Sequence, residues 1–254
     1  MIDTYLINLD RSPDRLAIMT KDLSREGIAF ERIPAVDGAA LSPDQLSIVD
    51  NASSKTKLGR NLSNGEIGCF LSHIAVAKRI LAGPSETALV LEDDAIVPQN
   101  AVEFISMLVN GINDNLGGNW ALVNLAHPAQ KFYIDVFNLQ AHEKTFSLNR
   151  AYYFPVLTTA LLWSKDGAAE FLKSVEKIHL PVDIHLQNFC CKNGLGLALV
   201  PAPFKPRGLE SVIRGSNSTQ SMASRHTSIR SFSRKWENYT FAIKHFAKEK
   251  FRNT

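Results

Sequence analysis

A short apolar run that ends in three consecutive carboxylates is the feature that most constrains the fold of this chain. Residues 87–91 (Thr-Ala-Leu-Val-Leu) follow a Gly-Pro break at 83–84 and lead directly into Glu92, Asp93 and Asp94. Such a run predicts a buried strand, and ligands of open α/β sheets bind just beyond the carboxyl ends of the strands. Neighbouring acids repel one another unless a cation or several hydrogen-bond donors are present. The pattern therefore fits either a site where Asp93 and Asp94 hold a hard cation or a solvated acidic turn.

The segments around this strand favour an α/β fold. Residues 4–9 are a predicted strand, a helix begins at Ser12-Pro13 and stops at Gly27, and a second strand covers residues 29–34. This order is typical of a parallel βαβ unit. Further helices are predicted from residues 42, 63, 100, 164 and 181, and strands over 119–125, 152–163 and 195–200. Residues 51–61 are predicted to be a mobile loop and 211–233 a flexible segment, while 127–149 show no clear period.

Composition is that of an ordinary globular protein. The chain has 254 residues, of which 45% are hydrophobic and 21% charged, enough for one α/β domain with a substantial core. The longest apolar runs are too short to cross a bilayer, and the first residues lack the basic region of a signal peptide. Cys69, Cys190 and Cys191 have neither disulfide nor zinc-site spacing. We therefore expect reduced thiols, a cytoplasmic protein and no zinc site.

Five polar positions are candidates for chemistry, and each also has a structural explanation. Arg11 and Arg15 follow the first strand where a helix begins, which suits either a bound anion or a solvated charged turn. Glu66 completes a capping box, and His73 on the same helix suits a buried, hydrogen-bonded side chain. Asp183 at the start of a later helix suits either a carboxylate that stabilises the helix end or a general base.

Several of these positions belong to motifs that occur in a fixed order. The motifs are residues 7–15 (Ile-Asn-Leu-Asp-Arg-Ser-Pro-Asp-Arg), Ala35-Val36-Asp37-Gly38, Glu66-x-Gly68-Cys69-x-x-Ser72-His73, Glu92-Asp93-Asp94 and, more weakly, residues 159–164 and Pro181-Val182-Asp183. In order and spacing this set resembles glycosyltransferase family 25, the bacterial lipopolysaccharide and lipooligosaccharide sugar transferases. Four motifs in register are far more specific than any one of them. Beyond Pro206 no segment resembles the family.

The resemblance implies a GT-A type nucleotide-sugar-binding domain with a mainly parallel central sheet flanked by helices. It also implies an inverting transfer of a sugar, most often galactose, from a UDP-sugar to a lipooligosaccharide or other surface glycan. Asp93 and Asp94 would hold Mn²⁺ or Mg²⁺ against the leaving diphosphate, and Asp183 would be the general base on the acceptor hydroxyl. The implied donor-binding residues are Asn8, Arg11, Asp37, Glu66, His73, Glu92 and Asp93.

Positive charge is concentrated at the end of the chain. The net charge is +3, yet from Arg225 onward eight Lys and Arg stand against two Glu, about +6 in total. We expect a transferase domain over residues 1–205, followed over 206–254 by a basic flexible segment and an amphipathic helix. That helix suits peripheral contact with anionic lipid on the inner face of the inner membrane, or an ordinary solvated basic face. Nucleic acid is not an expected partner, because no recognised binding module accompanies the charge.

Two other classes of function stay open. A nucleotidyltransferase would also use carboxylates and a cation, but it usually has a Gly-rich or basic phosphate loop that this sequence lacks. A non-catalytic nucleotide-sugar-binding protein is the second alternative. The intact Glu92-Asp93-Asp94 cluster argues against it, and measured turnover separates it from an enzyme.

Overall fold

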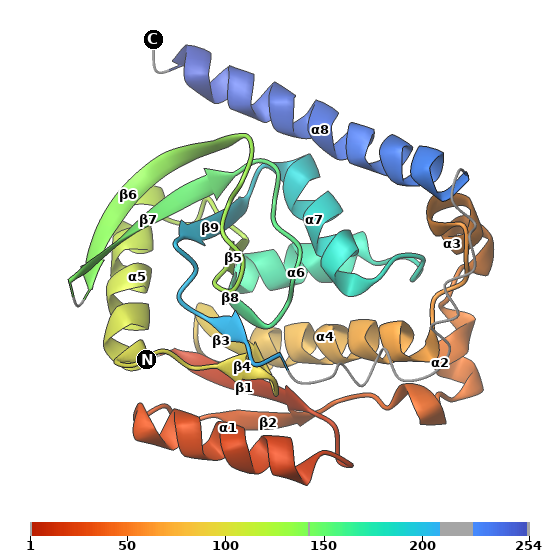
Figure 1. The fold of residues 1–254 in the computed structure, drawn as a ribbon, viewed down its shortest axis with the longest axis horizontal. Helices are drawn as coiled ribbons and strands as arrows, with labels where there is room; N and C mark the ends of the chain where they lie inside the picture. The colour runs from red at the N-terminus through yellow and green to blue at the C-terminus, as the bar shows by residue number, and fades with distance from the viewer. Residues whose placement is uncertain (1, 142, 209–225, 253–254) are drawn as a thin grey trace.

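The computed structural model describes residues 2–141, 143–208 and 226–252, with residues 226–234 and 252 described by their backbone alone (Figure 1). Its strands are β1 (Asp3–Asn8), β2 (Glu31–Pro34), β3 (Thr87–Glu92), β4 (Ala95–Ile96), β5 (Leu122–Asn124), β6 (Tyr133–Ala141), β7 (Lys144–Ala151), β8 (Ala160–Ser164), β9 (Gly196–Val200) and β10 (Lys205–Pro206). Its helices are α1 (Pro13–Arg25), α2 (Pro43–Ser47), α3 (Asn51–Leu58), α4 (Asn64–Ala82), α5 (Ala101–Leu116), α6 (Lys165–Ser174), α7 (Val182–Asn193) and α8 (His226–Arg252), with a 3₁₀ turn, η1 (Gly38–Ala40).

An eight-stranded sheet forms the centre of the molecule, in the order β2-β1-β3-β8-β5-β9-β7-β6. β1 pairs in parallel with both β2 and β3, and β5 with β9. β8 runs antiparallel to both of its neighbours, and so does β7. Six strands therefore point one way and two the other. The predicted α/β class with a helix-flanked sheet is confirmed, and the sheet is mixed because β8 and β7 are reversed.

Helices cover both faces of this sheet (Figure 1). Because side chains alternate along a strand, Val90 packs with α4, α6 and α7 on one face, while Leu89 packs with α1 and α5 on the other. Phe70 of α4 and Phe171 of α6 are fully buried on the first face, with ring centroids 6.1 Å apart. Burying each such side chain contributes roughly 1.5–3 kcal/mol. The two apolar layers hold the ends of the parallel strands in fixed positions.

The chain order around β1 leaves a crevice beyond the carboxyl ends of the parallel strands. From β1 the chain passes through α1, on one face, to β2; it then passes through α4, on the opposite face, to β3 on the other side of β1. This is a topological switch point, because the chain leaves β1 towards β2 and leaves β3 towards β5, in opposite directions along the sheet. The carboxyl ends of β1 and β3 therefore lie side by side with space above them.

One predicted loop is a helix. Residues 51–61 were expected to be mobile because they lack apolar periodicity, but α3 occupies 51–58 and ends at Gly59 in the left-handed conformation. Asp50 caps the helix, accepting a 2.9 Å hydrogen bond from the Ser53 N–H. The Ser54 hydroxyl is buried and donates to the carbonyl of His179 at 3.1 Å. The prediction was wrong because capping and a long-range contact, not an apolar stripe, stabilise this helix.

Other boundaries also differ from the predictions. The stretch without clear period, 127–149, contains β6 and most of β7, which form a hairpin. Within 152–163 the only described strand is β8, which begins at Ala160. Residues 211–225, predicted to be flexible, lie outside the described residues, and α8 begins at His226, inside the predicted flexible range.

Helix α8 lies against α7 and α3 (Figure 1). Ala242 is fully buried there, and the Asn238 side chain donates to Asn188 at 2.7 Å. Tyr239 stacks on Tyr153 with ring centroids 4.7 Å apart. None of the described helices combines the length and the hydropathy that a membrane crossing requires. The division of the chain at residue 205 stays a prediction.

Candidate functional site

A cavity of about 410 Å³ lies at the carboxyl ends of β1, β2 and β3, at the switch point. Its volume falls within the range of roughly 300–1,000 Å³ that is usual for small-molecule sites. Six of the predicted site residues line it: Asn8, Arg11, Asp37, Glu92, Asp93 and Asp94. The fold thus brings together residues from three segments that are far apart in the sequence.

Asn8, the last residue of β1, joins these segments. Its amide donates to Asp93 Oδ2 at 2.7 Å and to the carbonyl oxygen of Ser12 at 3.1 Å, and its oxygen accepts from Arg32 Nε at 3.0 Å. The side chain is buried, so each of these bonds replaces water that the amide has lost. Asn8 therefore fixes the loop that begins α1 relative to the acidic end of β3.

Arg11, in the loop after β1, and Arg15, in the first turn of α1, are paired with acids of the cavity. Arg15 donates to Asp93 Oδ1 at 3.1 Å, and Arg11 forms an ion pair with Asp37. The Ala39 N–H and the Arg11 guanidinium hold the pKa of Asp37 below its usual value. Because Asp93 also accepts from Asn8, both of its oxygens are engaged. The cavity wall thus combines cationic groups with acids that keep them in place.

Asp94 differs from its neighbour Asp93. Its Oδ1 atom is buried and has no hydrogen-bond partner among the residues that the structure describes. Burial, together with repulsion from Glu92 and Asp93, raises the pKa of Asp94 from 3.8 to about 6. A desolvated carboxylate oxygen beside other carboxylates is what a hard cation would stabilise. Of the two predicted metal ligands, Asp94 therefore has the oxygen that fits this role in the present geometry.

Helix α4 positions the loop after β2. A Cβ atom on Gly68 would lie 2.4 Å from the carbonyl oxygen of Val36, so only glycine permits this approach. The Ser72 hydroxyl accepts from the Val36 N–H at 2.9 Å and donates to the Gly68 carbonyl at 2.7 Å. The Gly-Cys-x-x-Ser spacing therefore has a structural explanation. Gly68 and Ser72 together hold the segment that carries Asp37 against the helix.

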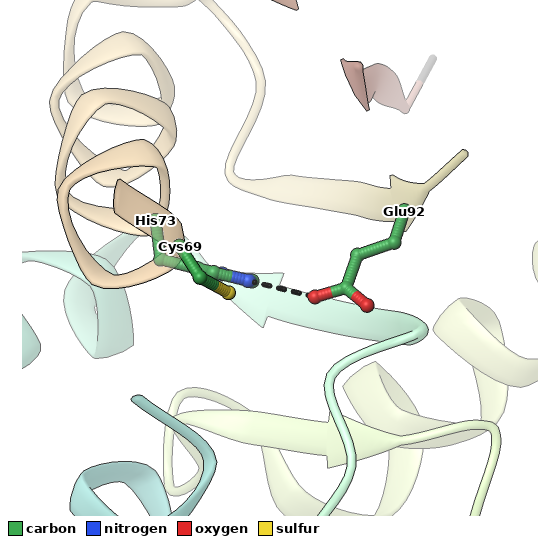
Figure 2. A group of neighbouring side chains, drawn as sticks. All are labelled: Cys69, His73 and Glu92. Carbon is green, nitrogen blue, oxygen red and sulfur yellow. Dashed lines mark hydrogen bonds and ion pairs between the residues drawn. The ribbon is translucent and has the colours of Figure 1, made fainter. Parts of the chain in front are cut away.

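The middle of α4 also positions the end of β3, as Figure 2 shows. His73 Nε2 lies 3.2 Å from Glu92 Oε1, which also accepts from the Thr158 hydroxyl at 2.6 Å. Burial alone would raise the pKa of Glu92, but the bonds and charge of His73, with the bond from Thr158, lower it below its usual value. Cys69 lies one helical turn before His73, and its sulfur faces the same carboxylate.

Glu66 is committed to the start of α4. It completes the predicted capping box, in which Ser63 N–H donates to Glu66 Oε2 at 2.8 Å. Both of its oxygens also accept from Arg60, each at 2.7 Å. These bonds outweigh burial and lower the pKa of Glu66. Glu66 and His73 are not among the residues that line the described cavity, so they act on it through the elements that they hold.

Asp183 lies in the first turn of α7 and accepts from the Ile184 N–H at 2.7 Å. It is not one of the residues that line the cavity. Its carboxylate is nevertheless close enough to Cys69 to contribute, with burial and with Glu92, Glu66 and Asp94, to a raised pKa of that thiol. The charge of Asp183 thus acts on the side of α4 that carries Cys69, as do the charges of Glu92, Glu66 and Asp94.

Two residues that hold the site were not predicted. Arg32 donates to Asn8 and Thr158 donates to Glu92, and nothing in their sequence neighbourhoods indicates these contacts.

Comparison with known proteins decides the family. A family model described as "Glycosyltransferase family 25 (LPS biosynthesis protein)" matches residues 1–186, which include all the predicted site residues. This chain belongs to glycosyltransferase family 25. The family motifs around Gly68 and Glu92 are therefore those whose contacts are described above.

Several animal proteins are among the relatives of this chain. A "Glycosyltransferase 25 family member" of Aedes aegypti is 39% identical over 94 residues, 35% of this chain and 16% of that protein. "Procollagen galactosyltransferase 2" of Homo sapiens is 33% identical over 125 residues, 48% and 20% of the two chains. "Procollagen galactosyltransferase 1" of Danio rerio is 38% identical over 96 residues, 36% and 16%. This chain therefore matches no more than a fifth of the length of these three relatives.

Proposed function

We propose that this family 25 chain transfers a sugar, with galactose as the first candidate, from a UDP-sugar to a lipooligosaccharide or other surface-glycan acceptor. The names of the human and zebrafish relatives support galactose as the sugar. The observation that carries the proposal is the buried, unpartnered oxygen of Asp94 beside a cavity that also contains Arg11 and Arg15. A cation on Asp94 and guanidinium groups that line the same cavity suit a diphosphate.

The residues divide this work according to their contacts. Asp94, with Asp93 or Glu92 beside it, would hold Mn²⁺ or Mg²⁺, which when bound neutralises charge on the leaving UDP. Arg11 can exchange Asp37 for a phosphate oxygen because its side chain is 46% exposed and that ion pair lies on the cavity wall. Asn8 and His73 keep the two halves of the site aligned. The position of the cavity at the switch point supports a GT-A type arrangement.

Asp183 is the proposed general base of an inverting displacement. Inversion in one step needs a base on the acceptor hydroxyl, on the side of the sugar opposite the leaving group. Asp183 comes from α7, which packs against α4, and it does not line the donor cavity, yet its charge acts on Cys69, which does. That combination, near the site but outside the donor cavity, supports the assignment.

The outward face of α8 is proposed to contact anionic lipid, which would make the protein peripheral on the cytoplasmic side of the membrane. Trp236 is 62% exposed, Ile243 50% and Phe251 81%, and their spacing of seven and eight residues places them on one face. Exposed Lys235, Lys244, Lys248 and Lys250 accompany this stripe. An apolar stripe among lysines is typical of interfacial helices, and such lysines favour an anionic surface.

Binding of UDP with and without Mn²⁺, measured by calorimetry, tests the function, followed by a screen of sugar nucleotides for hydrolysis. We expect UDP to bind only with the metal, and one UDP-sugar to be hydrolysed slowly. Asp94→Asn should abolish metal-dependent binding. No UDP binding in either condition would overturn the proposal. Metal-dependent UDP binding without turnover of any donor and acceptor would favour a non-catalytic nucleotide-sugar-binding protein. Transfer of a nucleotide to a sugar phosphate would favour a nucleotidyltransferase.

A further inference from the structure

The fold assembles a set of potential metal ligands that the cysteine spacing did not predict. Cys69 and His73 are four residues apart on α4, so they lie on the same face one turn apart. One ligand atom from each, together with one from Glu92 at the end of β3, lies within 4.8 Å of the others. Figure 2 shows the three side chains converging from the helix and the strand. The expectation of no zinc site considered the spacing of Cys and His in the sequence alone, which does not include a carboxylate from another element.

Their chemistry differs from that of the acidic site at Asp94. A thiolate, an imidazole and a carboxylate are the ligands of zinc, whereas Mn²⁺ and Mg²⁺ prefer oxygen. In a tetrahedral zinc site the ligand atoms are roughly 3.3–3.7 Å apart, and His73 Nε2 and Glu92 Oε1 are already 3.2 Å apart. Cys69 and Glu92 line the cavity, which provides a route by which an ion reaches these ligands.

The surroundings attract a cation but leave the site weak. The negative charges of Glu92, Asp183, Glu66 and Asp94 all act on the Cys69 sulfur. His73 Nδ1, by contrast, is buried without a partner among the described residues. A metal-bound imidazole normally donates its second N–H, and loss of that bond costs about 10–100-fold in affinity. A bound ion would therefore exchange with solvent.

We propose that Cys69, His73 and Glu92 form a reversible, inhibitory site for Zn²⁺ or a similar borderline-soft ion, next to the Mn²⁺ or Mg²⁺ site at Asp94 and distinct from it in its Cys69 and His73 ligands. An ion there takes Glu92 as a ligand and adds positive charge two residues from Asp94, so it weakens binding of the activating cation and of the nucleotide. Zinc binding does not depend on the proposed function; only the inhibition rests on it.

Cobalt(II) titration of the full-length reduced protein tests the site, because a thiolate-to-cobalt charge-transfer band reports sulfur ligation directly. We expect the band in the wild-type protein, its loss on addition of Zn²⁺, and its absence in Cys69→Ser. Cys191→Ser is the matched control, since Cys191 is fully buried, and it should keep the band. Circular dichroism verifies folding, and Cys69→Ala replaces the serine variant if that one does not fold.

Two further measurements distinguish the outcomes. The Asp94→Asn variant should retain the cobalt band. Loss of the band in that variant would overturn the proposal that Asp94 is not a ligand of this site. At a fixed Mn²⁺ concentration, Zn²⁺ should weaken UDP binding in the wild-type protein, and Cys69→Ser should need at least ten times more Zn²⁺ for the same effect. A wild-type protein without the band, or a Cys69→Ser variant that retains it, would overturn the proposal. If UDP does not bind under any condition, the cobalt spectrum still decides on the zinc site.

Discussion

Adjacent acids at the end of β3 have different properties because their hydrogen-bond partners differ. Asp93 accepts from Asn8 and Arg15, and Glu92 from His73 and Thr158, so each negative charge has donors. Asp94 Oδ1 is buried without such a donor, which together with its neighbours raises the pKa of Asp94 to about 6. An uncompensated buried charge destabilises the fold, so its presence here is a functional indication.

Metal-dependent UDP binding should weaken as the pH falls through about 6. Below that pH Asp94 is protonated and cannot ligate a cation, so at subsaturating Mn²⁺ the binding constant should drop about tenfold per pH unit. Calorimetry at a series of pH values between 5 and 8 measures this. Binding that is independent of pH over this range would contradict the assignment of Asp94.

The raised pKa of Asp94 also determines how the stability of the folded protein changes with pH. Since the folded-state pKa of Asp94 lies above its unfolded value, the folded protein binds more protons between about pH 4 and 6, and stability falls as the pH rises through this window. Asp94→Asn removes the charge. At pH 7 the variant should melt at the same temperature as the wild type or at a higher one. Any difference between the two melting temperatures should vanish near pH 4. A variant that melts well below the wild type at pH 7 would show that the carboxylate is structural.

Replacing Asp183 by Asn should reduce transfer by about 10²–10⁴-fold, the usual contribution of a general base. Binding of UDP with Mn²⁺ should be unchanged, because Asp183 does not line the cavity. The matched control is Asp166→Asn, which removes an exposed acid from the first turn of α6. Loss of both transfer and UDP binding in Asp183→Asn alone would indicate a structural role at the start of α7.

At the scale of elements, α4 organises the site. Its capping box fixes where it begins, Gly68 and Ser72 hold the loop after β2, and His73 holds the end of β3. The spacing of these residues is helical, so one rigid element sets the distance between the two halves of the cavity.

The Gly68→Ala substitution tests whether the close packing of α4 on the loop after β2 maintains the site. The new Cβ would lie 2.4 Å from the Val36 carbonyl and 2.9 Å from the Gly38 nitrogen, both backbone atoms. We expect a loss of about 1–3 kcal/mol in the free energy of unfolding and weaker UDP binding. Gly118→Ala is the control, because its Cβ would meet nothing within 4 Å. Chemical denaturation and calorimetry measure the two effects, and equal behaviour of both variants would refute the role of α4.

At the scale of the whole molecule, α8 has two different faces. One packs on the body through Asn238, Tyr239 and Ala242, so the helix is oriented by the domain. The other exposes Trp236, Ile243 and Phe251 to solvent. A helix that is held in place and apolar on its free side can orient a catalytic domain relative to a surface.

Binding to vesicles tests this surface. The protein should associate with vesicles that contain anionic lipid and not with neutral ones, and 1 M salt should weaken the association because it shortens the Debye length to about 3 Å. The double variant Trp236→Ser and Ile243→Ser should lose most of the binding. Ile18→Ser, at a 39% exposed position on α1, is the control and should bind as the wild type does. Equal binding to neutral and anionic vesicles, or an unaffected double variant, would contradict the proposal.

The sequence by itself determined those features that depend on neighbours along the chain. The strand before Glu92, the helix starts at Pro13 and Ser63, and the order of the family motifs follow from local propensity, capping and spacing. Helix α3 shows the limit of this approach, because its stability depends on a contact between Ser54 and His179 that no local pattern contains.

Only the tertiary structure decided which polar groups meet. Asn8 and Asp93, Glu92 and Thr158, and Cys69 and Glu92 are separated by tens of residues in the sequence. The parallel pairing of β1 with β3, the antiparallel pairing of β3 with β8 and the packing of α4 bring them within reach. The pKa of Asp94 and the convergence of Cys69, His73 and Glu92 follow from this arrangement. Burial and the distances between charges are properties of the folded sheet, and the chain order alone does not contain them.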